Sequence, residues 1–272
     1  SEVRQRPNDG RPQAVRALIL YPMNALVEDQ LTRLRKALDS DKTREWLKTK
    51  ANNNSIYFGR YTGSTPSSGE LHSFENGVKK VNQYKVEQLR KELKALEKSS
   101  KAIKQHIDEN KDVPDVLSDT PENLIAFYPR LDGSEMRTRF DMQVAPPDIM
   151  ITNYSMLSIM LMREIDSVIF DKTKDWLNCD DEYSKELSQE EKTKEKENRV
   201  FHLIIDELHL YRGTQGTEVA YLLKLILNRL GLHPNHSQLK ILASSASLDG
   251  DNEKSIDFIQ DFFGVTDAKK SF

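Results

Sequence analysis

Five short apolar runs interrupt an otherwise polar chain and predict the strands of one sheet. Each run is rich in β-branched residues and nearly continuous rather than alternating, which is typical of strands covered on both faces. The runs are Ala17–Tyr21, 56–58, 149–152, 202–205 and 241–243. This pattern predicts parallel strands in the core of the molecule.

Between these runs, apolar residues recur at three- and four-residue spacing and predict amphipathic helices. The clearest cases are segments 25–38 and 218–230. Strands that alternate with helices imply right-handed crossovers between parallel strands. We therefore predict an α/β fold in which helices flank a parallel sheet.

Two stretches do not follow this alternation. Segment 78–110 is rich in Lys, Glu, Leu and Gln and contains neither Gly nor Pro. Its apolar residues recur at helical spacing. It predicts a long amphipathic helix or a helical hairpin outside the sheet. Segment 179–199 is dominated by Asp, Glu and Lys and has too few apolar residues for a core, so we predict a solvated insert.

The composition agrees with polar inserts around an ordinary core. Of the 272 residues, 37% are hydrophobic and 31% charged, and the formal net charge of −3 gives no global attraction to nucleic acid. Cys179 is the only cysteine, which excludes a disulfide framework and fits a reducing cytoplasm. No apolar run approaches the length of a membrane span, so we expect a cytoplasmic location and no membrane partner.

Two adjacent carboxylates, Asp206 and Glu207, directly follow the fourth apolar run. At the end of a parallel strand, Asp206 would hold Mg²⁺, directly or through water, beside the phosphates of ATP. Glu207 would orient or deprotonate the attacking water. The alternative is a strand that ends in a charged turn, and the segments on either side favour the nucleotide site.

Polar residues near these carboxylates extend the predicted site. Ser245 and Ser247 follow the fifth run, where their hydroxyls could bond His209 and transmit the state of the nucleotide. The alternative is a Ser-rich turn that caps the next helix. Arg212 follows His209 closely in the sequence. It would either contact nucleic acid or hold the loop in place.

Three further turns follow predicted strands and are expected to contact nucleic acid. Their residues are Pro22 and Asn24, then Arg60, Thr62 and Gly63, then Thr152 and Asn153. Ligands of open parallel sheets bind beyond the carboxyl ends of the strands, and free N–H groups at helix starts bind phosphate. The alternative for each turn alone is an ordinary strand-to-helix connection.

One half of a nucleotide site is missing from the sequence. None of the eleven glycines is followed by lysine, so the phosphate-binding pattern G-x-x-x-x-G-K-[ST] does not occur.

In order and spacing, these segments resemble the motifs of superfamily 2 DNA helicases of the DEAD/DEAH-box class. The matching segments are 21–30 for motif Ia, 60–63 for motif Ib, 152–153 with 156–157 for the next strand-contacting motif, 206–209 for motif II and 245–247 for motif III. The continuation of motif II through Tyr-Arg-Gly-Thr at 211–214 resembles the subgroup related to Lhr and the mitomycin-repair helicases. Within it, Glu-Met-Arg-Thr-Arg at 135–139 before Pro-Pro-Asp at 146–148 resembles helicases of phage-defence islands such as Druantia and DISARM.

The resemblance implies a partial first RecA-like motor domain over 1–272, with a largely helical insertion at 64–140 and a charged insertion or loop at 171–200. It implies ATP hydrolysis with Mg²⁺, driving 3′-to-5′ movement on single-stranded or partly duplex DNA, with RNA not excluded. The partners implied are the rest of the helicase polypeptide and a defence-system or repair protein. Because motif I and the second motor domain are missing, we expect a fragment that is inactive in isolation.

Two alternatives belong to other classes. The chain could be a non-catalytic nucleic-acid-binding or scaffold subunit with a motor-like fold, although retention of Asp206 and Glu207 argues against that. It could also be a nucleotide-gated assembly factor whose helical insert binds a partner.

Overall fold

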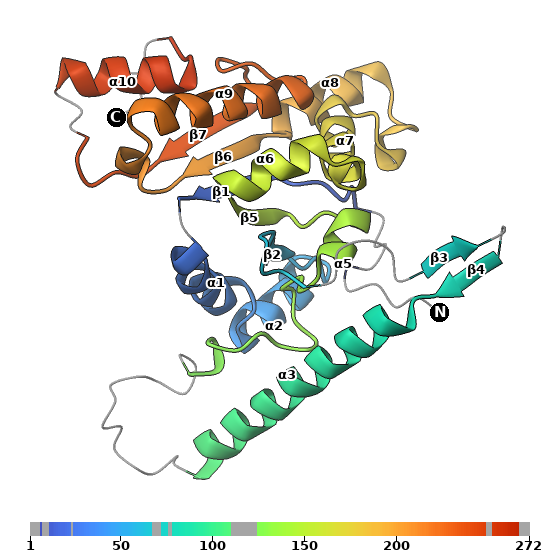
Figure 1. The fold of residues 1–272 in the computed structure, drawn as a ribbon. Helices are drawn as coiled ribbons and strands as arrows, with labels where there is room; N and C mark the ends of the chain where they lie inside the picture. The colour runs from blue at the N-terminus through green and yellow to red at the C-terminus, as the bar shows by residue number, and fades with distance from the viewer. Residues whose placement is uncertain are drawn as a thin grey trace.

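The computed structural model describes residues 6, 11–22, 24–66, 72–75, 78–109, 124–248 and 252–266. Its centre is a five-stranded parallel sheet flanked by helices, in the order β2-β5-β1-β6-β7 (Figure 1). The strands are β1 Ala17–Tyr21, β2 Phe58–Arg60, β5 Ile149–Asn153, β6 Phe201–Ile205 and β7 Leu239–Ala243. The predicted α/β class, RecA-like with a long helical insert, is confirmed.

The strand bounds match the apolar runs to within one residue at β1, β5 and β6, whereas β7 begins two residues earlier than the run at 241–243 and β2 begins two residues later than the run at 56–58. The amide of Tyr57 donates to the carboxylate of Asp148 at 2.9 Å instead of joining the ladder. The ladder therefore starts only at Phe58, and its last residue is Arg60.

Helices cover the two faces of the sheet unequally (Figure 1). On one face, α1 packs over β2, β5 and β1 in a small apolar cluster, and α2 follows it. The other face buries the larger core, to which α6, α7, α9 and α10 contribute. The bounds are α1 Asn24–Leu38, α2 Asp41–Lys50, α5 Arg139–Val144, α6 Tyr154–Met162, α7 Ser167–Asn178, α8 Gln189–Asn198, α9 Gly213–Arg229 and α10 Glu253–Phe263, with short 3₁₀ turns η1 Glu164–Asp166, η2 Glu182–Ser184 and η3 Leu208–Leu210.

The long helix α3, Gln83–Glu109, lies outside the sheet, as the spacing of its apolar residues predicts (Figure 1). The prediction of helix from residue 78 onward was wrong. Val78–Val81 is strand β4, which pairs antiparallel with β3, His72–Glu75. The helix starts only after Asn82, whose side chain accepts the amide of Lys85 at 3.2 Å.

The charged stretch expected as a solvated insert or loop is largely helical. It holds the end of α7, the turn η2 and α8, which buries no side chain and starts with a capping box from Ser188 to Glu191. The guanidinium of Arg199, 2% exposed, donates to the carbonyl of Trp176 at 2.6 Å and to Ser184 at 2.8 Å, and pairs with Asp181. Because α8 has no apolar face, this segment is held by helix capping and by the buried guanidinium of Arg199. The division into a motor domain and insertions stays a prediction.

Across the described ranges, no helix has both the length and the apolar character that crossing a membrane requires.

Candidate functional site at the carboxyl edge of the sheet

The ends of four neighbouring strands bring polar residues into one row. Tyr21 of β1 is in register with Asn153 of β5. On its other side, Leu20 is in register with Ile205, and the amide of Asp206 donates to the carbonyl of Leu20 at 3.2 Å. The amide of Ser244 donates to Ile205 at 3.0 Å, which continues the row past β6 to β7.

Hydrogen bonds from neighbouring groups hold the side chain of Asp206 at this edge. Its carboxylate accepts hydrogen bonds from the hydroxyl of Ser244 and from the amide of Glu207, the latter at 3.1 Å. The amide of Leu208 donates to the carbonyl of Ser244 at 2.8 Å, so the ends of β6 and β7 are joined twice. Ser244 was not predicted as a site residue, although its place directly after the fifth apolar run is the same signal that marked Ser245 and Ser247.

Glu207 has a left-handed backbone, with φ 53° and ψ 45°. A non-glycine residue in this region is held there by its surroundings at a cost of about 1–2 kcal/mol. The conformation turns the chain out of the strand, and the side chain of Glu207 remains 37% exposed. Its Oε2 lies 3.2 Å from Nδ1 of His209. A carboxylate placed in this way is accessible to a water molecule and lies beside the ring of His209.

Two buried tyrosines flank Asp206. The pKa of Tyr21 is raised first by burial and then by the charge of Asp206, and the same two causes raise the pKa of Tyr211. Both hydroxyls therefore stay protonated, and that of Tyr211 has no hydrogen-bond partner within the described part of the chain. The hydroxyl of Tyr21 is therefore a neutral donor to the carboxylate of Asp206.

The donor set at this edge fits Mg²⁺ bound together with a nucleotide. Mg²⁺ usually keeps several waters and binds through one or two carboxylates plus substrate phosphates. In the described ranges, no cluster of three or more His, Cys, Asp or Glu residues could enclose a metal ion. If an ion binds at this edge, Asp206 is the carboxylate that would hold it, with water and phosphate as the remaining ligands.

The remaining residues expected near the carboxylates, Ser245, Ser247 and Arg212, are hydrogen-bonded to one another. Ser247 accepts from the guanidinium of Arg212 at 3.2 Å, and its amide donates to the hydroxyl of Ser245 at 3.4 Å. Arg212 also lies 6.0 Å from the ring centroid of Phe258 on α10. Arg212 thus joins the turn after β6 to the turn after β7. His209 lies beside Glu207. A hydrogen bond between His209 and Ser245 or Ser247 stays a prediction.

The three turns expected to contact nucleic acid end at the same edge, because β2, β5 and β1 are neighbours. Thr62 and Thr152 are buried and bonded within the protein. Thr152 donates to the carbonyl of Tyr61 at 2.6 Å, and the amide of Thr62 donates to Thr65 at 3.0 Å. Their side chains hold the turns in shape and are not open to a ligand.

The accessible groups at this edge are fewer. Arg60 is partly exposed and pairs with Glu28 of α1, Gly63 is exposed with open space beside its Cα, and Asn153 caps α6 by accepting the amide of Met156 at 2.8 Å. Pro22 is half-buried. Asn24 is the first residue of α1, but its side chain, like all of Met23, lies outside the described residues.

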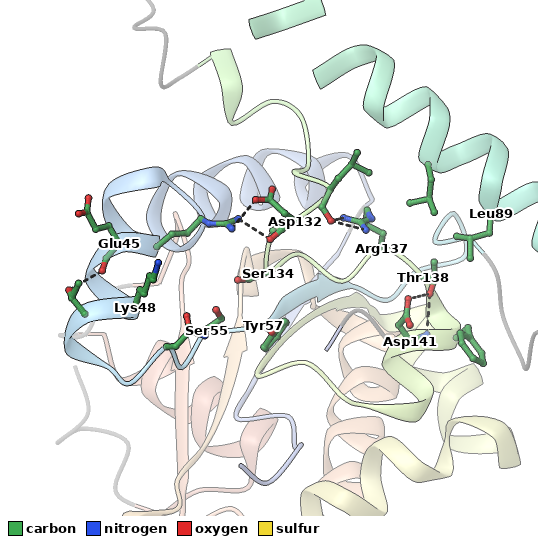
Figure 2. A pocket seen from close by; sticks show the side chains of 17 residues that line it. Glu45, Lys48, Ser55, Tyr57, Leu89, Asp132, Ser134, Arg137, Thr138 and Asp141 are labelled. Carbon is green, nitrogen blue, oxygen red and sulfur yellow. Dashed lines mark hydrogen bonds and ion pairs between the residues drawn. The ribbon is translucent and has the colours of Figure 1, made fainter. Parts of the chain in front are cut away.

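A large cavity, whose lining includes neither Asp206 nor Glu207, lies before the start of β2 (Figure 2). It measures about 820 Å³ and lies between α2, α3 and the segment leading into α5. On its wall, Arg137 donates to the carbonyl of Arg130 at 2.7 Å, Thr138 caps α5, and burial lowers the pKa of Arg137. No sequence pattern indicated this cavity, because segments far apart in the chain form it.

The chain is similar to a protein of a phage-defence system. It is 32% identical, over an alignment of 286 residues, to Druantia protein DruE from Escherichia coli (strain UMEA 4076-1). The alignment covers 97% of this chain but 14% of that relative, so the chain spans about one seventh of its length. No family model and no solved structure matches the chain.

Proposed function

We propose that this chain is the part of an ATP-dependent DNA helicase or translocase that holds Mg²⁺ and contacts the strand. Asp206 holds the ion and Glu207 orients or deprotonates the attacking water. The bound ion and ATP would supply the polarised phosphate, and a base in line with the γ-phosphorus completes the requirement for hydrolysis. The accessible groups of the three turns, led by Arg60, bind the phosphates of a single strand.

The observation that carries this proposal is the single row at the carboxyl edge. Asp206 shares that edge with the turns after β2, β5 and β1, since all five strands are parallel. A motor that moves along a nucleic-acid strand needs its nucleotide site and its strand-binding site on one rigid element, so that a change at one site alters the other site.

The groups that bind the β- and γ-phosphates must come from outside this sequence. One side of the site is open to them, because β7 is the last strand of the sheet and Leu242 on it is 53% exposed. Parallel sheets are normally covered on both faces, and an open edge strand pairs readily with another strand. We propose that a further segment of the polypeptide adds here, next to Ser244 and Asp206.

The direct test is ATP hydrolysis by the full-length protein with and without single-stranded DNA. We expect Mg²⁺-dependent turnover that the strand stimulates. The matched variant is Asp206→Asn, which keeps the shape but removes the charge that holds the ion. Turnover that is independent of DNA, or unaffected by Asp206→Asn, contradicts the proposal.

A second candidate function is a non-catalytic nucleic-acid-binding subunit with a motor-like fold. The absence of the phosphate-binding pattern from these 272 residues favours it. The same assay separates the two, because such a subunit would bind the strand in full-length form and hydrolyse no ATP.

The biological setting we propose is antiviral defence. The named relative is a Druantia protein, and the segment 135–139 resembles helicases of defence islands of that kind. A defence-system protein is therefore the partner we expect, and a plaque assay with a strain that lacks the gene tests this separately.

A further inference from the structure

Helix α3 carries a row of cations along one side. Arg90, Lys94 and Lys98 recur every four residues, and Lys91 stands three residues before Lys94. Residues at these spacings are neighbours on the surface of an α-helix. All four side chains are exposed. The helix therefore presents a continuous cationic row to its surroundings.

Few carboxylates interrupt this row. Within residues 87–101, all of which the structure describes, the same side of the helix carries Glu87 and Glu97. Oε1 of Glu97 lies 2.7 Å from the ammonium of Lys101, which extends the row by another turn. Since the formal net charge of the chain is −3, this excess of positive charge is local to α3.

Helix α8 shows what a balanced charged helix looks like in the same chain. Its three lysines alternate with four glutamates, and it buries no side chain. Mixed signs of this kind are typical of a solvated surface. The row on α3 is different, because its cations outnumber the carboxylates beside them.

The apolar side of α3 is turned toward the rest of the molecule. Leu89 and Leu93 line the cavity before β2, and Figure 2 shows Leu89 at its wall. Ile103 lines a second cavity together with Tyr128 and Leu131. The cationic row lies on the other side of the helix and faces outward, along the outside of the molecule (Figure 1).

The chemistry of the row favours a nucleic-acid backbone over a protein or a membrane. The centres of protein interfaces are depleted in lysine and enriched in aromatic residues, and segment 90–98 contains no aromatic residue. A helix that binds a membrane surface must insert its apolar side, whereas the apolar side of α3 lines two cavities of the molecule.

The spacing of the cations agrees with this choice. Side chains four residues apart on a helix are separated by about 6 Å along its axis. A nucleic-acid strand carries one phosphate about every 3.4 Å. Successive cations of the row can therefore meet different phosphates of one backbone.

We propose that the cationic row of α3 is a second nucleic-acid contact, which binds the phosphate backbone independently of base sequence. It lies apart from the first contact, because α3 borders the cavity before the start of β2, whereas the turns led by Arg60 follow the ends of the strands. The inference rests on the proposed function for the nature of the ligand. Two contacts on separate elements would hold one long polymer more tightly than either contact alone.

The test compares two triple variants of the full-length protein that lose the same net charge. The first replaces Lys91, Lys94 and Lys98 of α3 by glutamine, which keeps a good helix former at each position. Labelled single-stranded and duplex oligonucleotides of unrelated sequence are titrated at several salt concentrations. We expect affinity to fall about tenfold or more at low salt, and the salt slope to fall by about two to three, since each phosphate contact contributes about 0.7 to 0.9. The form of nucleic acid that shows the loss is the one that α3 contacts.

The matched control replaces Lys192, Lys194 and Lys196 of α8 by glutamine. Its affinity and salt slope should equal those of the wild type. Wild-type values in the α3 variant, or an equal loss in both variants, overturn the inference. So does an α3 variant that loses binding only to vesicles of anionic phospholipid. Binding that depends on α3, in a protein whose ATP hydrolysis no strand stimulates, supports the inference and contradicts the proposed function alone.

Discussion

Glu207 is the residue at which a catalytic role can be distinguished most directly from a structural one. Its backbone is left-handed, its carboxylate is partly exposed, and the ring of His209 lies beside it. We expect Glu207→Gln in the full-length protein to lower strand-stimulated turnover by about 10²-fold or more, since it removes the base but keeps the shape. The affinities for Mg²⁺-ATP and DNA should remain, as equilibrium binding would show.

The control for this variant is Glu218→Gln. Glu218 is an exposed carboxylate on α9 that accepts from Tyr154 at 3.2 Å, and it has no place in the row. Its turnover should match the wild type. If Glu207→Gln also turns over at a nearly normal rate, Glu207 serves only to shape the turn.

Arg60 is the accessible cation of the three turns, and it is already paired with Glu28. We expect Arg60→Ala to weaken single-strand binding about equally for unrelated sequences and to reduce the salt slope by roughly one charge. Glu28→Gln should have the opposite sign, because it releases Arg60 for a phosphate. Both are measured by titrating labelled oligonucleotides at several salt concentrations.

Arg44 offers a matched control for Arg60. It is similarly exposed and similarly paired, with Asp132 at 3.0 Å, but it lines the cavity before β2. Arg44→Ala should leave affinity and salt slope unchanged. An unchanged salt slope in Arg60→Ala would instead mean that the strand binds elsewhere.

At the scale of elements, the sequence predicts best where burial alone decides the structure. The five strands carry continuous apolar runs, and α1, α3 and α9 carry apolar stripes, so their positions followed from local pattern. Strand β4 was missed because its four residues are stabilised by pairing with β3, a partner that no periodicity reveals. Helix α8 was missed because it has no apolar face at all.

The segment around α8 depends instead on Arg199, which gives a prediction at this scale. Replacing one member of a buried ionic network leaves the other groups unpaired and costs about 3–5 kcal/mol. In Arg199→Met, the carboxylate of Asp181 loses its cationic partner and keeps only donors from Ser184, and the carbonyl of Trp176 loses one of its two donors. We expect faster hydrogen exchange through segment 179–199, measured by mass spectrometry.

Lys194→Met is the comparison, because Lys194 is exposed on the same helix. Its exchange should match the wild type. Equal protection in both variants would show that α8 is held by contacts other than those of Arg199.

At the scale of the whole molecule, the sequence marked the strand ends that share one edge, but it did not show which of them are neighbours. Each turn was marked by polar residues after an apolar run, and parallel strands placed all of them on one edge. Which turns are neighbours depends on the strand order, a long-range property that the sequence does not display. The positions of Tyr21 and Ser244 beside Asp206 became visible only through the register between strands.

The same edge leads to the prediction for the isolated chain of 272 residues. It can present Asp206 and Glu207, but it contains no G-x-x-x-x-G-K-[ST] loop, so neither a lysine nor a ring of backbone amides is available for the β- and γ-phosphates. Without those groups the ion has one protein carboxylate and no positioned phosphate, and the exposed edge of β7 stays open to water. We therefore expect negligible ATPase activity from this chain, with or without single-stranded DNA, in a phosphate-release assay in which the full-length protein is active. Robust DNA-stimulated turnover by the chain alone would show that its own residues bind the phosphates, and that the site is complete without a further segment at β7.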